Sequence, residues 1–156
     1  MSSWLFAIVA ILACAGTLGV FLATRAFLTR RHLQKVFHGR APEASFESCR
    51  ARFPQVELRR TALAYRWVQA LVPFAGLAPI EADDDLWKHL RIDQGRVGDQ
   101  FESAHEWRGE RPEDAVQPPV PSARTVGDLM AEVLAHGYEG YAAVLSRYAN
   151  GDAPKP

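Results

Sequence analysis

The acidic side chains between residues 83 and 106 are the groups whose types and spacing come closest to a chemical site. Glu102 and His105 form a Glu-x-x-His step, which would place two metal ligands on one face of a helix. A di-iron bundle needs two such steps and two further glutamates, and this chain has one step. Asp83, Asp84 and Asp85 could attract a hard cation, but they lack the alternating spacing of a calcium loop. We therefore expect a solvated helix face and an acidic helix cap, and no metal site.

Nucleophilic chemistry has equally little support in the sequence. Ser45, Ser48 and Ser122 have no G-x-S-x-G elbow around them. Cys49 is a lone thiol without metal-ligand spacing, and we expect it to act as a small, partly buried apolar side chain. The run Gly95-Arg96-Val97-Gly98 is too sparse in glycine to cradle a phosphate. The sequence therefore predicts no catalytic residue and no cofactor.

Two helical segments are expected before the acidic helix. The first covers residues 54–72, with Pro54 in its first turn. Its apolar stripe consists of Leu63, Trp67, Ala70, Leu71 and Phe74. The second is a short helix over residues 86–90, which the three preceding aspartates would cap.

The acidic helix itself is expected over residues 94–107. Asp93 is its predicted N-cap. Its buried side would carry Val97, Phe101 and Ala104. A loop with four prolines then covers residues 109–124.

A strong helix begins at Thr125, which is expected to form a capping box with Asp128. Gly137 ends it, and one more short helix and a frayed tail over residues 151–156 follow. The apolar positions of these last two helices are Val126, Leu129, Met130, Val133, Leu134, Tyr138, Tyr141, Leu145 and Tyr148. Trp67, Trp87 and Trp107 fall in different predicted helices and are expected to share one core cluster. No strand pattern is visible, so the fold class is all-α.

An uncharged segment dominates the beginning of the chain. Residues 1–24 contain no charged side chain, and the 21 residues from Trp4 to Thr24 are apolar all round. As a helix they would extend about 31 Å, the thickness of a bilayer's hydrocarbon core. We predict a retained transmembrane anchor over residues 1–24, a basic juxtamembrane helix and linker over residues 25–53, and a helical domain over residues 54–150.

Two cleaved leaders are the alternatives to an anchor. A signal peptide would carry basic residues before its apolar run, and the first four residues have none. Ile11-Leu12-Ala13-Cys14 loosely resembles a lipobox, but ten further uncharged residues follow Cys14. Both features favour the retained anchor.

The charges that flank the span predict its orientation. Residues 25–40 hold five basic side chains and no acids, whereas residues 41–156 hold 18 acids against 13 Lys and Arg. Basic flanks stay on the cytoplasmic side, so the N-terminus is expected outside an inner (cytoplasmic) membrane and the domain in the cytoplasm. The residues expected at the membrane interfaces are Trp4, Arg25, Arg30, Arg31 and Lys35. The acidic body argues against nucleic acid as a partner.

Small residues at a spacing of four mark one side of the span. Ala15, Gly19 and Ala23 form a small-xxx-small ridge along which two such helices could approach closely. The ridge suggests a homodimer through the membrane helix. Small residues are also common in membrane helices that do not pair. Arg outnumbers Lys 15 to 3, which is typical of a GC-rich bacterial genome.

The order of the expected elements over about residues 56–136 resembles the acyl carrier protein family, a small four-helix bundle. Its features here are an acid-rich loop, a middle helix, a proline-containing linker and a Thr-Val-x-Asp-Leu helix opening. The matching residues are Asp84, Asp85, Leu86, Leu90, Asp93, Phe101, Trp107 and Thr125–Leu129. The family places a serine directly after the aspartate that matches Asp93, and its hydroxyl carries phosphopantetheine.

This chain has Gln94 at the position of that serine, followed by Gly95 and Arg96. A carboxamide offers no oxygen nucleophile for modification, so this alignment implies a domain that carries no phosphopantetheine. Carrier domains of this family present an acidic middle helix to basic protein partners. The resemblance implies that this chain keeps that acidic surface. The implied partner-binding residues are Asp93, Asp99, Glu102 and Glu106.

We therefore expect a membrane-anchored, non-catalytic module that binds a protein. One alternative is an enzyme, or a subunit of one, that acts on lipid-linked substrates at the membrane. The other is a functional acyl carrier, which would require a different alignment.

Overall fold

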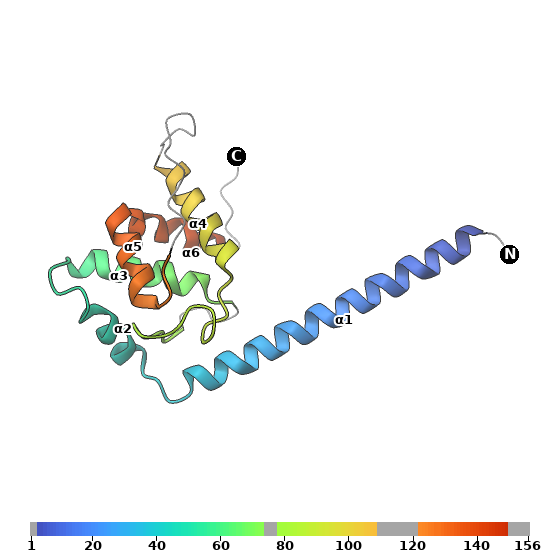
Figure 1. Ribbon diagram of the computed structural model, residues 1–156, viewed down its shortest axis with the longest axis horizontal. Coiled ribbons are helices and arrows are strands. Elements are labelled where there is room, and N and C mark those ends of the chain that lie inside the picture. Colours follow the sequence, from blue (N-terminus) through green and yellow to red (C-terminus); the bar gives the residue numbers. More distant parts are fainter. Residues whose placement is uncertain (1–2, 74–77, 109–121, 150–156) are drawn as a thin grey trace.

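The longest element is a single helix at the N-terminal end, and a bundle of shorter helices lies beside its C-terminal end (Figure 1). The computed structural model describes residues 3–73, 78–108 and 122–149. The elements are α1 (Ser3–Phe37), α2 (Pro42–Arg50), α3 (Leu58–Leu71), α4 (Gln94–Trp107), α5 (Val126–His136), the 3₁₀ helix η1 (Tyr138–Tyr141) and α6 (Ala142–Ala149). Over these ranges the chain forms helices and no strand, which confirms the all-α prediction.

Helix α1 runs without interruption through the uncharged segment and the basic segment. No Gly or Pro lies between residues 25 and 37, and Gly39, in the left-handed conformation at φ 79°, follows its end. Among the described residues, α1 is the one helix long and apolar enough to cross a membrane. Trp4 and the large apolar side chains from Ile8 to Leu28 are exposed.

The C-terminal end of α1 is part of the domain. Leu33 is 3 % exposed, and Phe37 lies partly buried against the same core. The Nε2 atom of His32 lies 3.0 Å from the backbone carbonyl oxygen of His89. Leu33 and His32 therefore fix the last turns of α1 to the bundle by packing and by a hydrogen bond.

The core of the bundle forms around α3, which contacts α2, α5, η1 and α6. The predicted helix over residues 54–72 begins four residues late, because residues 51–57 make successive turns that reverse the chain after α2. Trp67 and Leu71 are buried as expected, whereas Leu63 and Ala70 are only partly buried. Because helices cover α3 on several sides, the burial extends to Thr61, Ala64, Tyr65, Val68 and Gln69. Phe74 lies outside the described residues.

The short helix predicted over residues 86–90 is absent, and this segment forms turns. Its backbone pairs instead with the residues before α5. The Leu86 N–H donates to the Arg124 carbonyl over 3.0 Å, and the Val126 N–H donates to the Asp84 carbonyl over 3.0 Å. Asp85 and Thr125 thereby form an isolated antiparallel bridge, and the Asp85 carboxylate accepts bonds from the N–H groups of the turn that follows.

Asp84 also departs from its predicted role as a helix cap. Its side chain is 4 % exposed and forms a two-pronged ion pair with Arg40, whose Nη1 and Nη2 atoms lie 2.6 and 2.9 Å from the two carboxylate oxygens. The Glu81 N–H donates a third hydrogen bond to this carboxylate over 2.9 Å. The pair fastens the α1–α2 connection to the segment before Leu86.

The predictions for α4 and α5 are confirmed. Helix α4 has the predicted bounds, and its Val97, Phe101 and Ala104 are buried. Thr125 and Asp128 form the predicted capping box, and Gly137 ends α5 in the left-handed conformation at φ 69°. The predicted loop over residues 109–124 and the tail over residues 151–156 lie largely outside the described residues.

The three tryptophans of the domain do not share a cluster. Trp67 is fully buried and meets the edge of Phe101, with ring centroids 5.3 Å apart. Trp87 is half-buried on the side of the bundle near α1. Trp107 is 49 % exposed at the end of α4, where its ring lies against Tyr141. Trp87 packs against the edge of the core, whereas Trp107 lies outside it and is available at the surface.

Candidate functional site

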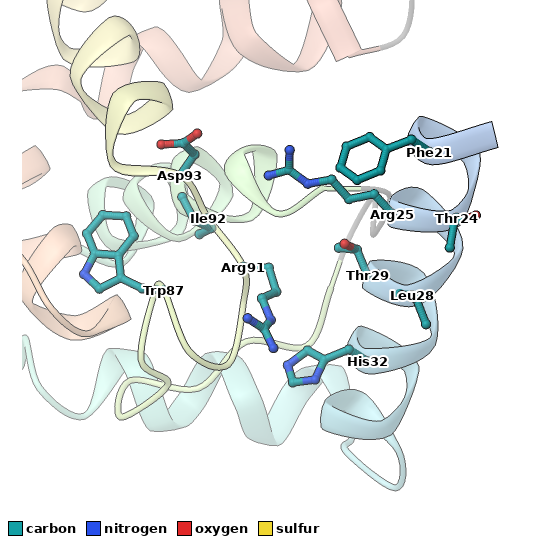
Figure 2. Close-up of a pocket in the computed structure, with 10 residues that line it drawn as sticks. All are labelled: Phe21, Thr24, Arg25, Leu28, Thr29, His32, Trp87, Arg91, Ile92 and Asp93. Atoms are coloured by element: carbon teal, nitrogen blue, oxygen red, sulfur yellow. The ribbon is translucent and has the colours of Figure 1, made fainter. Parts of the chain in front are cut away.

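A cleft of about 530 Å³ lies between α1 and the turn that leads into α4. Figure 2 shows its two walls, with one row of side chains from α1 and a second row from residues 87–93. The α1 wall consists of Phe21, Thr24, Arg25, Leu28, Thr29 and His32. The opposite wall consists of Trp87, Arg91, Ile92 and Asp93. This volume is in the range of small-molecule sites in proteins.

A second, smaller hollow of about 380 Å³ adjoins the cleft and shares four of its residues. Arg25 of α1, Arg91 of the turn and Arg96 of the first turn of α4 all line it. Three guanidinium groups from three parts of the chain therefore border one hollow beside α1. A guanidinium presents planar pairs of N–H donors that match the oxygens of phosphates and carboxylates.

These three guanidinium groups have no protein partner among the described residues, in ion pairs or in hydrogen bonds. Several arginines elsewhere in the domain pair with carboxylates: Arg40 with Asp84, Arg52 with Asp83, Arg60 with Glu139 and Arg124 with Asp85. Arg59 and Arg66 on α3 are exposed and take part in no ion pair among the described residues. The hollow differs from these isolated surface positions because it brings three unpaired guanidinium groups together beside α1.

The backbone at Arg91 is strained. Its φ is 56°, in the left-handed region that side chains other than glycine rarely adopt. Leu90 and Ile92 on either side are buried, whereas Arg91 is exposed toward α1. The left-handed residue lets the chain bury both neighbours and still direct Arg91 into the cleft (Figure 2). Strain of this kind costs of order 1–3 kcal/mol and is concentrated at functional sites.

Asp93 supplies the one carboxylate of the cleft. Its Oδ1 atom accepts a hydrogen bond from the Gly95 N–H over 2.9 Å, and so caps α4 as predicted. The predicted partner-binding set is therefore divided. Asp93 lies in the cleft, whereas Asp99, Glu102 and Glu106 lie exposed on the helix side opposite the buried stripe.

The other predicted residues also have definite places. Gln94 is the exposed first residue of α4. Glu102 and His105 do not come together as ligands, because Glu102 is exposed and the Nδ1 atom of His105 lies 3.0 Å from the Tyr138 hydroxyl. Within the described ranges, no group of three or more metal-ligating side chains is found.

The residues predicted for the membrane are exposed along α1. Trp4 is 61 % exposed at its beginning, and Arg25, Arg30, Arg31 and Lys35 are exposed on its inner half. Ala15, Gly19 and Ala23 are exposed along the span. A Cβ atom added at Gly19 would meet nothing within 4 Å, so this side of the helix is open.

The sequence analysis named Arg25 as an interface residue and Asp93 as a helix cap and partner-binding residue, but it did not predict that the two line one cleft. Arg91 and Arg96 lie more than 60 residues from Arg25, and neither is one of the residues that match the acyl carrier pattern. One local feature could have indicated Arg91: no Asp or Glu lies three or four residues before or after it, so it has no nearby acidic partner in the sequence. Comparison of the chain with protein-family models, with curated proteins and with solved structures finds no match.

Proposed function

We propose that this chain is a membrane-anchored, non-catalytic interaction module. In this proposal α1 crosses the inner membrane with its N-terminus outside, and the helical domain on the cytoplasmic side presents the outer face of α4 to a basic protein. The acyl carrier resemblance enters as a hypothesis about this face: it preserves the acidic surface of the middle helix and dispenses with the phosphopantetheine, because Gln94 replaces the serine.

The observation that supports the proposal is that three carboxylates on α4 are exposed and unpaired among the described residues. Asp99, Glu102 and Glu106 recur at i, i+3 and i+7, so they share one face, and all three are exposed. No ion pair within the described part of the chain uses them. The fold is therefore stabilised without them, and their charge is available to another molecule.

An aromatic side chain stands next to these carboxylates. Trp107, one residue after Glu106, is half exposed and rests on Tyr141. Tryptophan is enriched among the residues that contribute most binding energy at protein interfaces, and surrounding charges set the choice of partner. A basic partner with an apolar contact for Trp107 matches this surface.

The test reverses the charge of the face. The change is Glu102→Lys together with Glu106→Lys in the full-length chain, followed by affinity capture from membranes dissolved in mild detergent. We expect the captured partner to be lost, because two attractive charge contacts become repulsive, while the helical circular dichroism stays unchanged.

A matched control changes the same charge at another place. Glu43→Lys with Glu57→Lys alters exposed acids on α2 and at the start of α3, away from α4. Capture should survive this control. Capture that is unchanged by the α4 pair, or lost equally with both pairs, contradicts the proposal.

A further inference from the structure

We propose that the cleft between α1 and the turn before α4 binds the phosphate headgroup of an anionic phospholipid. Arg25, Arg91 and Arg96 would hold the phosphate. This inference rests on the membrane-spanning part of the proposed function and goes beyond it, because it assigns a ligand site rather than a protein surface.

The three arginines provide the charge that such a ligand requires. They border one hollow, come from three separate parts of the chain, and have no partner among the described residues. Against them stands the single carboxylate of Asp93, which is already hydrogen-bonded to the first turn of α4. The site therefore keeps a net positive charge of about two, which complements one phosphodiester and its neighbours.

The position of the cleft favours a lipid over a soluble phosphate. If residues 4–24 of α1 occupy the hydrocarbon core, Arg25 is the first residue at headgroup level. Arg91 and Arg96 line the same hollow and so lie at the same depth. Phe21 and Leu22, immediately toward the membrane, are 63 % and 52 % exposed and offer an apolar surface to acyl chains.

The apolar part of the cleft supports the same assignment. Trp87 and Ile92 belong to the wall opposite α1 (Figure 2), and Leu28 lines the cleft on the α1 side. Tryptophan is characteristic of the membrane–water interface, where its ring contacts the glycerol and upper acyl region. A ligand with a phosphate at one end and hydrocarbon at the other fits a cleft with arginines beside an apolar wall.

The backbone of Arg91 gives the proposal a variant that separates binding from folding. Glycine adopts the left-handed conformation without the side-chain clash, so Arg91→Gly should fold at least as well as the native chain. It nevertheless removes the guanidinium from the cleft. If Arg91 serves only the fold, this change should raise the stability of the domain and have no other effect. If Arg91 binds a ligand, the change should weaken that binding.

The experiment is native mass spectrometry of the full-length chain in mild detergent with equal amounts of phosphatidylglycerol and phosphatidylcholine. The native chain should retain phosphatidylglycerol in preference to phosphatidylcholine. Arg91→Gly with Arg96→Gln should weaken phosphatidylglycerol retention by roughly 25-fold, at about fivefold for each basic side chain removed near an anionic group. Its unfolding transition should be unchanged or higher.

The matched control is Arg50→Gln with Arg59→Gln, which removes the same charge at the α2–α3 connection, away from the part of α1 that lines the cleft (Figure 1). It should keep the lipid preference. The proposal would be wrong if both double variants lost the preference for phosphatidylglycerol equally, or if the native chain retained the two lipids equally. A further measurement replaces the lipid with glycerol phosphate, which has no acyl chains. If glycerol phosphate binds as strongly as phosphatidylglycerol, the cleft binds a soluble phosphate and the assignment to a membrane lipid is wrong.

Failure here is distinguishable from failure of the proposed function. The α4 charge variants test partner capture and leave the cleft unchanged, and the cleft variants leave the α4 carboxylates unchanged. Lost lipid preference with intact capture refutes only the headgroup site. Extraction of the native chain from membranes by carbonate refutes the anchor on which both depend.

Discussion

At the scale of single residues, the fold depends on polar groups that are buried with their partners. The Asp84 carboxylate is almost fully enclosed, and its charge is balanced by the two N–H groups of Arg40 and by a backbone N–H. Removing one member of such a pair typically costs more than the pair contributes, because the other charge is left without compensation. Cys49 and Tyr65 lie in the same region and are also buried.

Cys49 makes the stability of the domain sensitive to alkaline pH. Its burial, together with the nearby Asp84 charge, raises the pKa of the thiol from its ordinary value of 9.0 to about 12. Above pH 9 the unfolded chain loses this proton and the folded chain keeps it, so the free energy of unfolding must fall as pH rises. We expect a loss of about 1.4 kcal/mol by pH 10 that is absent in Cys49→Ala.

The measurement is urea unfolding of the full chain in detergent at several pH values from about 8 to 10. Cys14→Ala is the control, because it removes the other thiol of the sequence and leaves the core of the domain unchanged. Burial also raises the pKa of Tyr65, so Tyr65 lowers the free energy of unfolding further above pH 10. The measurements therefore stop at pH 10. The same slope in Cys49→Ala and the native chain would show that the thiol does not titrate in this way.

Local residue patterns were predicted from the sequence, and long-range pairs were not. The Asp93 cap and the Thr125–Asp128 capping box involve residues two or three apart, so the sequence displays both partners together. Arg40 and Asp84 are 44 residues apart, and nothing in either segment indicates the other. The same separation explains why Arg25 was predicted at the interface and the other cleft arginines were not.

At the scale of elements, α1 has two parts with different surroundings. Its outer turns expose apolar side chains, as a lipid-facing helix would, while its last turns place Leu33 in the core of the bundle. His32 adds a hydrogen bond to the turn that forms the cleft. The helix is therefore both the predicted anchor and a structural element of the domain.

This double role predicts a large effect for one leucine and a small effect for another. Leu33→Ala should lower the free energy of unfolding of the domain by about 2–3 kcal/mol, because it leaves a cavity beside the bundle. Leu18→Ala, at a position 58 % exposed, should change it by less than about 0.5 kcal/mol. Urea unfolding of the full chain in detergent measures both, and equal values would show that α1 does not contribute to the core.

Sequence patterns predicted elements well where one side is buried and the ends have clear signals. Helix α4 has a cap and a single apolar stripe, and its bounds match the prediction. Helix α3 is covered on several sides, so its stripe was placed only in part. The segment over residues 86–90 has the composition of a capped helix, but pairing with residues 124–127 draws its backbone into turns.

At the scale of the whole molecule, the charge distribution predicts one topology. The basic residues that follow the span should keep the domain on the cytoplasmic side. In intact spheroplasts a C-terminal tag should be protected from protease added outside, and it should be digested once the membrane is opened. The chain should also remain in the pellet after carbonate treatment. Digestion of the tag in closed spheroplasts would reverse the orientation.

The uninterrupted passage of α1 into the bundle has a consequence for encounters between molecules. With no glycine or proline between the span and Leu33, no flexible tether separates the domain from the bilayer. If α1 is anchored as proposed, the remaining freedom of the domain is lateral diffusion and spin about the helix axis. Every copy of the domain would then stay at the same distance from the bilayer surface. Encounters with another membrane-bound protein would take place in two dimensions, with the binding surfaces already at a fixed height.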